Sequence, residues 1–130
     1  MSDTPALAVP IGAFLGWAGL FVHNLAELPG QSFLSPESLV PLLVTAVLVA
    51  GWFTPERQAA TIALLCWGVL NLVGGGVLSV LPLPVLPFVP EQTLSHYLVH
   101  GVYALAQVPL VLSTVVWLRL RHRSGRRISP

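Results

Sequence analysis

The sequence predicts an all-α, polytopic membrane protein: an antiparallel bundle of four transmembrane helices with both termini on the cytoplasmic side. Three observations lead to this prediction. Hydrophobic residues make up 55% of the 130-residue chain and charged residues only 8%, whereas a soluble domain carries roughly 25% charged residues because its surface must face water. Four apolar segments have about the length that crosses a bilayer. All six basic residues are arginines, and four crossings would place every one of them on the same side.

The first predicted helix covers residues 6–28 and ends before Pro29 and Gly30. No positively charged residue precedes this apolar run, which is longer than the roughly 7–15 residues of a secretory signal's core. We therefore expect a retained membrane helix and not a cleaved signal peptide.

The second predicted helix covers residues 36–53. Ser35, Pro36 and Glu37 supply an N-cap, a proline at the first helical position and an acid in the first turn. Pro41 lies inside the early part of the segment, so the helix is expected either to begin nearer Leu39 or to kink.

The third predicted helix covers residues 55–81. Thr54, Pro55 and Glu56 repeat the pattern of cap, proline and acid. The run from Gly74 to Gly76 indicates either a close helix contact or a hinge beside a cavity.

The fourth predicted helix covers residues 93–120 and is followed by a basic tail, residues 119–130. Pro109 in its middle removes a backbone hydrogen bond to Leu105, so a bend is expected. The connection before this helix, residues 82–90, contains four prolines and remains apolar, which favours an extended path. The connections are short, which favours antiparallel neighbours in a single membrane domain, residues 1–130.

Arginine placement predicts the orientation. Arg57 lies between the second and third segments, and the others follow the fourth: Arg119, Arg121, Arg123, Arg126 and Arg127. The opposite connections, about 29–36 and 82–93, contain no arginine. Positive residues that flank spans favour the cytoplasm, so we expect a multi-pass protein of the plasma (inner) membrane with lipid as its main partner. Trp52 and Trp117, near the inner span ends, fit an aromatic belt.

Polar residues inside spans are costly and therefore become candidates for function. Glu27 follows His23 by one turn on the first helix. The fourth helix carries a polar stripe with offsets of 0, 4, 7 and 11: His96, His100, Tyr103 and Gln107. The first helix ends outside and the fourth begins outside, so the two sets are expected within one or two turns of the same outer boundary. Gly12-x3-Gly16 predicts a small-residue contact face.

This layer predicts a binding site for a transition-metal ion, since imidazoles with a carboxylate suit zinc, copper, iron or nickel. Its ligands are expected to be His23, Glu27, His96 and His100. Haem b is a variant that needs axial histidines from two different helices, for example His23 with His100 or with His96. Four further polar residues are expected to surround the ligands: Asn24, Asn71, Tyr103 and Gln107.

Three other hypotheses compete with this one. The polar residues could serve only as hydrogen-bonding contacts between helices, in an accessory subunit of a larger membrane complex or a homo-oligomer. They could relay protons in a coupled transporter or channel subunit. They could also provide acid–base catalysis on a lipid or quinone headgroup, so the pattern does not decide whether the protein is an enzyme. A nucleic-acid surface, a nucleotide fingerprint and a Ser-His-Asp pattern are absent from the sequence.

Overall fold

The computed structural model describes residues 4–126, which contain helices and connections but no strand. Residues 70–77 continue the third helix as a π-helix, and a short 3₁₀ turn follows it. The elements in chain order are α1 (Thr4–Glu27), α2 (Pro36–Trp52), α3 (Arg57–Val69), η1 (Leu70–Val77), η2 (Leu78–Val80) and α4 (Leu94–Arg126).

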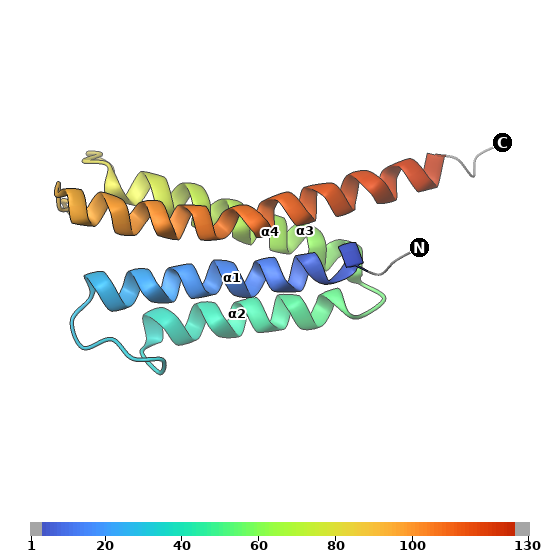
Figure 1. Ribbon diagram of the computed structural model, residues 1–130, viewed down its shortest axis with the longest axis horizontal. Helices are drawn as coiled ribbons and strands as arrows, with labels where there is room; N and C mark the ends of the chain where they lie inside the picture. The colour runs from blue at the N-terminus through green and yellow to red at the C-terminus, as the bar shows by residue number, and fades with distance from the viewer. Residues whose placement is uncertain (1–3, 127–130) are drawn as a thin grey trace.

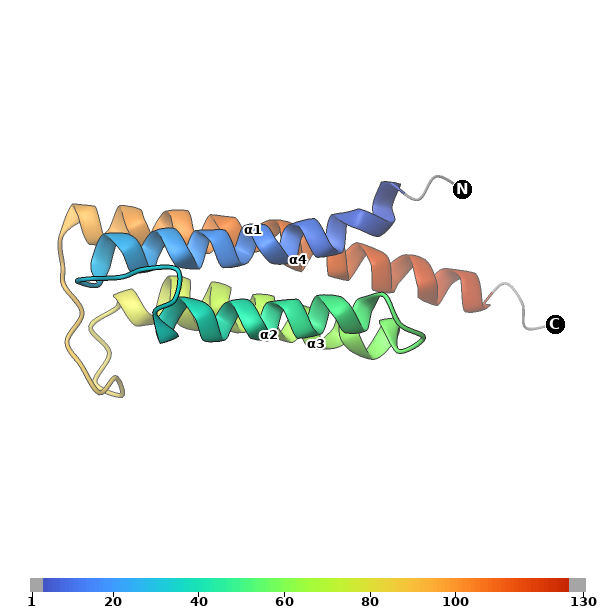
Figure 2. The same ribbon diagram turned by 90° about the horizontal axis from the view of Figure 1, so that it is seen from below.

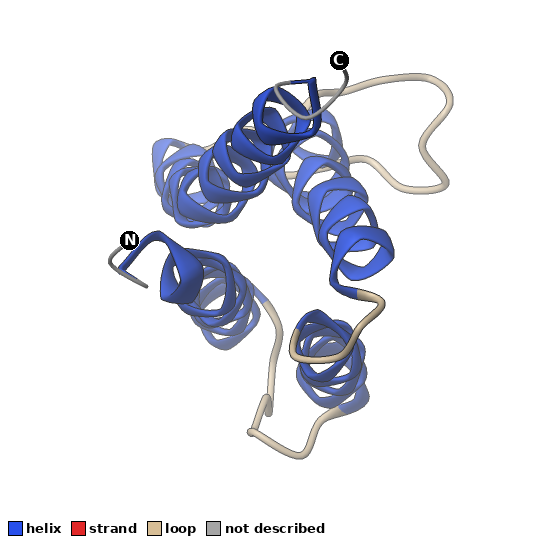
Figure 3. Ribbon diagram, turned by 90° about the vertical axis from the view of Figure 1, so that its right-hand side faces the viewer, coloured by secondary structure: helices blue, strands red, loops and turns tan. Residues whose placement is uncertain are grey.

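The helices run up and down beside one another, and the two ends of the chain lie at the same end of the bundle (Figure 1). Seen along the bundle, α1 lies beside α4 and α2, while α3 lies between α2 and α4 (Figure 3). Three helical segments are long and apolar enough to cross a membrane: Leu7–Glu27, Arg57–Val80 and Leu94–Ser124. The remaining helix, α2, is apolar but has only 17 residues. The antiparallel arrangement is as predicted.

Glycines allow α1 and α4 to pack closely. A Cβ atom added at Gly12 would lie 2.8 Å from the backbone nitrogen of Leu110, and one at Gly19 would overlap the Cβ of Ala106. Gly16 faces the same helix. The predicted small-residue contact face is therefore confirmed, and it brings α1 and α4 close together from Gly12 to Gly19.

The start of α2 is where the sequence placed it, with Pro36 in the first turn and Pro41 inside the helix. The Ser35 backbone has the extended conformation of an N-cap, but its side chain does not cap the helix. Its hydroxyl oxygen instead accepts a hydrogen bond of 2.9 Å from the Ser32 N–H, which orders the preceding turn.

The predicted start of the third helix is wrong by two residues, because α3 begins at Arg57 with Glu56 at its N-cap. The Thr54 hydroxyl is used in the turn between α2 and α3. It donates to the Gly51 carbonyl at 2.7 Å and accepts from the Glu56 N–H at 3.2 Å. Thr54 therefore closes the turn and does not cap the helix.

The helix that begins as α3 stays helical to Val80 but widens into the π-helix η1. The glycine run falls in η1, where a Cβ on Gly76 would lie 2.8 Å from the Cβ of Ala104 on α4. Gly75 and Gly76 therefore serve close packing against α4 within an altered helical register, whereas Gly74 meets only Leu70 of its own helix.

The longest helix, α4, has 33 residues and extends six residues beyond its predicted end. It contains Pro109, bends near its middle, and its C-terminal part projects past the other helices (Figures 1 and 2). Arg127, the last arginine of the predicted tail, lies outside the described residues.

Apolar side chains form the core toward the end of the bundle where the chain begins. The core consists of Val9, Ala13, Val49, Trp52, Ala60, Leu64 and Leu110. Trp52 is only 1% exposed, so its predicted place in an interfacial belt is wrong. The Arg57 guanidinium lies 4.2 Å from its ring centroid, and this cation–π contact covers the edge of the core.

Candidate functional site

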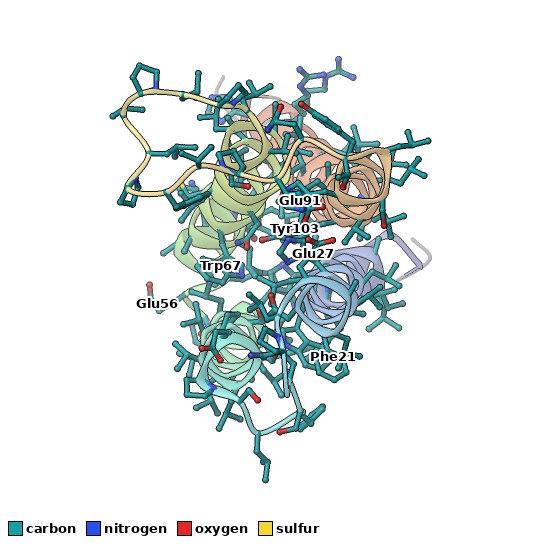
Figure 4. All side chains as sticks on the ribbon, turned by 90° about the vertical axis from the view of Figure 1, so that its left-hand side faces the viewer. Phe21, Glu27, Glu56, Trp67, Glu91 and Tyr103 are labelled. Carbon is teal, nitrogen blue, oxygen red and sulfur yellow. The ribbon has the colours of Figure 1, made fainter. Side chains whose placement is uncertain are left out.

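The four predicted ligand residues meet at the end of the bundle where α1 ends and α4 begins. His23 Nε2 lies 3.0 Å from His100 Nε2, and His96 Nδ1 lies 2.6 Å from Glu27 Oε2. The ring centroid of His100 is 4.4 Å from that of His23 and 4.5 Å from that of His96. Viewed from this end, Glu27 and Tyr103 point into the space between the helices (Figure 4). We call His23, His96 and His100 the histidine group.

Asn24 determines which nitrogen of His23 carries a proton. The Asn24 amide nitrogen donates to the Glu37 carbonyl and to the Ser38 hydroxyl, both at 3.0 Å. The amide oxygen must therefore be the atom that faces His23 Nδ1 at 3.2 Å. Since that oxygen can only accept, Nδ1 of His23 carries a proton and donates it to Asn24.

The π-helix performs the same role for His100. The carbonyl oxygen of Gly75 lies 3.0 Å from His100 Nδ1, and a carbonyl can only accept. The Ser79 hydroxyl donates to the same carbonyl. His100 therefore carries a proton on Nδ1. No spacing in the sequence links the glycine run to this histidine.

Glu27 orients His96. A carboxylate accepts hydrogen bonds, so the 2.6 Å contact assigns the proton to His96 Nδ1. The other ring nitrogen, His96 Nε2, is buried and has no hydrogen-bond partner among the described residues. Buried polar atoms without a partner are uncommon in folded proteins and call for an explanation.

The three imidazoles thus share one pattern. Each commits Nδ1 as a donor to an oxygen atom, which in the neutral ring leaves Nε2 with a lone pair and no proton. Two such lone pairs face each other across 3.0 Å, between His23 and His100. They repel unless a cation, either a proton or a metal ion, lies between or beside them. The contact between these two imidazoles is therefore a hydrogen bond only when one of the two rings carries a second proton.

Exposure falls from the end of the bundle inward. The side chains of Glu27 and His96 are 18% and 12% exposed, whereas His100 is 5% exposed. His100 is therefore buried, whereas His23 and His96 are half-buried. His122, the remaining histidine, is exposed on the projecting part of α4 and takes no part.

The predicted surrounding residues divide into two sets. Asn24 contacts His23 directly, and the ring of Tyr103 lies beside it with centroids 5.3 Å apart. The Tyr103 hydroxyl donates to Asn71 Oδ1 at 2.6 Å, so Asn71 is connected to the histidine group through Tyr103. Gln107 is deeper, donates to the Gly16 carbonyl at 2.8 Å, and is not brought to the histidine group.

Beyond Asn71 the polar network ends in the middle of the bundle. A polar cavity of about 10 Å³, the size of one water molecule, lies among Thr45, Trp67, Asn71 and Gln107. Farther along, the buried hydroxyls of Thr61 and Thr114 are bonded to carbonyls of their own helices. The apolar core then fills the rest of the bundle.

In the part of the chain that the structure describes, no three or more His, Cys, Asp or Glu side chains already surround one point as the ligands of a metal ion would. No protein-family model, curated protein or solved structure matches the chain. The contacts of the histidine group and the apolar character of the helices are therefore the observations that bear on function.

Proposed function

We propose that this protein binds a transition-metal ion at one end of a four-helix membrane bundle, through the Nε2 atoms of His23, His96 and His100. The observation that carries the proposal is the shared use of Nδ1 as a donor to an oxygen. A metal-bound histidine almost always donates its second ring N–H to a carboxylate, a carbonyl or another oxygen. The site has these outer partners in place for all three imidazoles.

In the proposed site, Glu27 has a different role from the one that the sequence predicts. The sequence suggested that Glu27 is a ligand, whereas its contact with Nδ1 of His96 supports a role as the partner of a ligand. Zinc binds imidazole nitrogen at 2.0–2.1 Å, so two ligands of a tetrahedral ion lie about 3.3 Å apart. The 3.0 Å between His23 and His100 Nε2 requires a shift of a few tenths of an ångström. Three neutral imidazoles suit zinc or copper and leave one position open.

The packing argues against haem b. A porphyrin with His23 and His100 as axial ligands would have to lie between two nitrogens that are 3.0 Å apart. It would also separate α1 from α4, which pack closely at Gly12 and Gly19. We therefore propose a bare ion.

Four crossings with both termini inside remain part of the proposal. The 17 residues of α2 give a helix about 25 Å long, close to the roughly 30 Å of a hydrocarbon core. The helix lies alongside α1 for most of its length (Figure 1). This arrangement supports a topology in which all arginines face the cytoplasm and the histidine group faces the opposite side.

Metal analysis of purified protein tests this proposal. We expect protein in mild detergent to bind one zinc or copper ion per chain, measured by elemental analysis after dialysis. His23→Ala and His100→Ala should abolish binding, whereas His122→Ala should retain it. Thermal melts of each variant show whether it still folds. Absence of stoichiometric metal, or equal binding by the unchanged protein and its three variants, would overturn the proposal.

A shared proton is the second candidate, favoured by the 3.0 Å separation of the two Nε2 atoms, which is a hydrogen-bond distance. Protonated imidazole cannot bind a metal, so the two cations compete for the site. A transporter also needs a path across the bundle, and the polar network stops at Asn71 and the small cavity. Proton flux in proteoliposomes that is lost in Glu27→Gln would favour transport over metal binding.

An accessory-subunit role stays a prediction. It is favoured by polar contacts that join helices, such as the bonds from Asn24 to Glu37 and from Gln107 to Gly16. Such bonds stabilise membrane bundles by about 0.6 kcal/mol each. If this is their only role, partner chains should co-purify and His→Gln changes should be tolerated.

A further inference from the structure

An apolar groove of about 300 Å³ runs along the C-terminal half of α4, at the opposite end of the bundle from the histidine group. This volume is within the range of small-molecule sites. The groove lies between Ala8 of α1 and a stripe of α4 that includes Leu112, Val116, Trp117 and Leu120.

The bend in α4 creates the groove. The two helices touch at Gly12, where an added Cβ would lie 2.8 Å from the backbone nitrogen of Leu110. Pro109 lies immediately before this contact, and beyond it α4 diverges from the beginning of α1 (Figure 2). The space left between the helices is lined by side chains of both.

The lining suits a hydrocarbon chain. Leu112, Val116 and Leu120 are 59%, 51% and 49% exposed. The one hydroxyl in the groove, that of Ser113, donates to the carbonyl of Leu110 at 3.1 Å and needs no other partner. From Pro109 to Leu120 the helix rises by about 16 Å, which is half of a roughly 30 Å hydrocarbon core. The groove therefore has the length of one leaflet.

Positive charge surrounds the open end of this groove. Arg119 lies directly before Leu120, the last lining residue, Arg121 and Arg123 follow it, and all three arginines are exposed. The Arg121 guanidinium lies 5.3 Å from the ring centroid of Trp117, a lining residue. Arg123 follows Val116 by seven residues, two turns along the same face. Cationic side chains thus stand where a lipid headgroup would lie if an acyl chain filled the groove.

We propose that this groove binds one acyl chain of an anionic glycerophospholipid, whose phosphate contacts the three arginines. Guanidinium groups bind phosphate through charge-assisted, often bidentate hydrogen bonds. Each arginine at the membrane surface adds to the affinity for anionic lipid. The apolar wall selects for a lipid over a free ion, and the arginines select for an anionic headgroup over a zwitterionic one.

Tryptophan quenching by brominated lipid tests the proposal in detergent-solubilised full-length protein. Phosphatidylglycerol with brominated acyl chains should quench fluorescence at concentrations on the order of tenfold lower than brominated phosphatidylcholine. Trp117→Phe should remove this difference, because Trp117 lines the groove. Changing Arg119, Arg121 and Arg123 together to Gln should also remove it, and excess inorganic phosphate should not.

A matched pair of substitutions tests the groove itself. Ala8→Phe fills it, whereas Ala59→Phe adds the same ring to an exposed position of α3 outside it. We expect only Ala8→Phe to weaken quenching by the anionic lipid. Equal quenching by the two lipids, full displacement by phosphate, or unchanged quenching in Ala8→Phe would overturn the proposal. A change of oligomeric state in Ala8→Phe alone would also overturn it, by showing that a second copy occupies the groove.

Discussion

The three imidazoles of the histidine group are held by three different kinds of oxygen: an amide, a backbone carbonyl and a carboxylate. Only the carboxylate carries a charge. It contacts His96 at the end of the bundle, where the side chains of Glu27 and His96 are 18% and 12% exposed. The charge of Glu27 can therefore attract a cation and make the bound imidazole more basic, two effects that a neutral acceptor cannot supply in full.

Glu27→Gln separates charge from geometry at this contact. The glutamine oxygen can still accept from His96 Nδ1, but the negative charge is gone. We expect zinc affinity, measured by isothermal titration calorimetry, to fall by about 10- to 100-fold, the usual effect of losing such an outer partner. Glu91→Gln is the control, since Glu91 is exposed and lies just before the start of α4, at the same end of the bundle as Glu27. Unchanged affinity in Glu27→Gln would argue that the carboxylate has no part in metal binding.

Sequence spacing predicted which residues meet but not which atoms they use. The i, i+4 spacing placed His96 and His100 on one face, and the topology placed His23 and Glu27 at the same depth. The role of the Gly75 carbonyl could not be predicted, because it depends on the π-helix and on contact between distant segments. The amide of Asn24 is oriented by α2, which no spacing within α1 reveals.

Helix packing depends on a few glycines. How much each one matters depends on which atoms of the neighbouring helix lie opposite it. Hydropathy predicted the helices well, because their apolar lengths differ sharply from the connections. It could not distinguish an α-helix from a π-helix over residues 70–77, because the length of an apolar run does not report the hydrogen-bond pattern of the backbone. It also could not show that Thr54 closes a turn, because the same residue types cap helices.

The same change, glycine to alanine, at two positions tests the contact between α1 and α4. Gly12→Ala places a methyl group 2.8 Å from the backbone of Leu110, so one helix must shift. We expect a loss of about 1–3 kcal/mol in the free energy of unfolding. Gly101→Ala, within α4, meets no atom within 4 Å and should stabilise the helix by about 0.5–1 kcal/mol. Reversible unfolding in mixed micelles measures both, and equal stability would contradict the close contact.

At the scale of the whole molecule, the ends of the bundle differ in chemistry. One end carries the histidine group and the connections without arginine, and the other carries Arg57, the arginines of α4 and both chain ends (Figure 1). The polar network reaches from the first end to the middle, and the apolar core occupies the second half. This asymmetry suits a binding site open to one side of a membrane better than a path through it.

Single cysteines test the four-crossing topology in a Cys66→Ser background. Ser32→Cys lies in the connection between α1 and α2, and Glu56→Cys lies in the turn between α2 and α3; both positions are exposed. If α2 crosses the membrane, a membrane-impermeant maleimide should label Ser32→Cys in intact cells and Glu56→Cys only after lysis. Labelling of both positions from the same side would show that α2 does not cross.

X-ray absorption spectroscopy of the zinc-loaded protein in detergent tests the proposed three-histidine site, because it reports the atoms bound to the ion. We expect three imidazole nitrogens at about 2.0–2.1 Å, with the fourth position held by a light atom such as a water oxygen. The His122→Ala protein should give the same spectrum, since His122 lies on the exposed part of α4. A first shell with fewer than three imidazoles, or one made only of oxygen atoms, would contradict it.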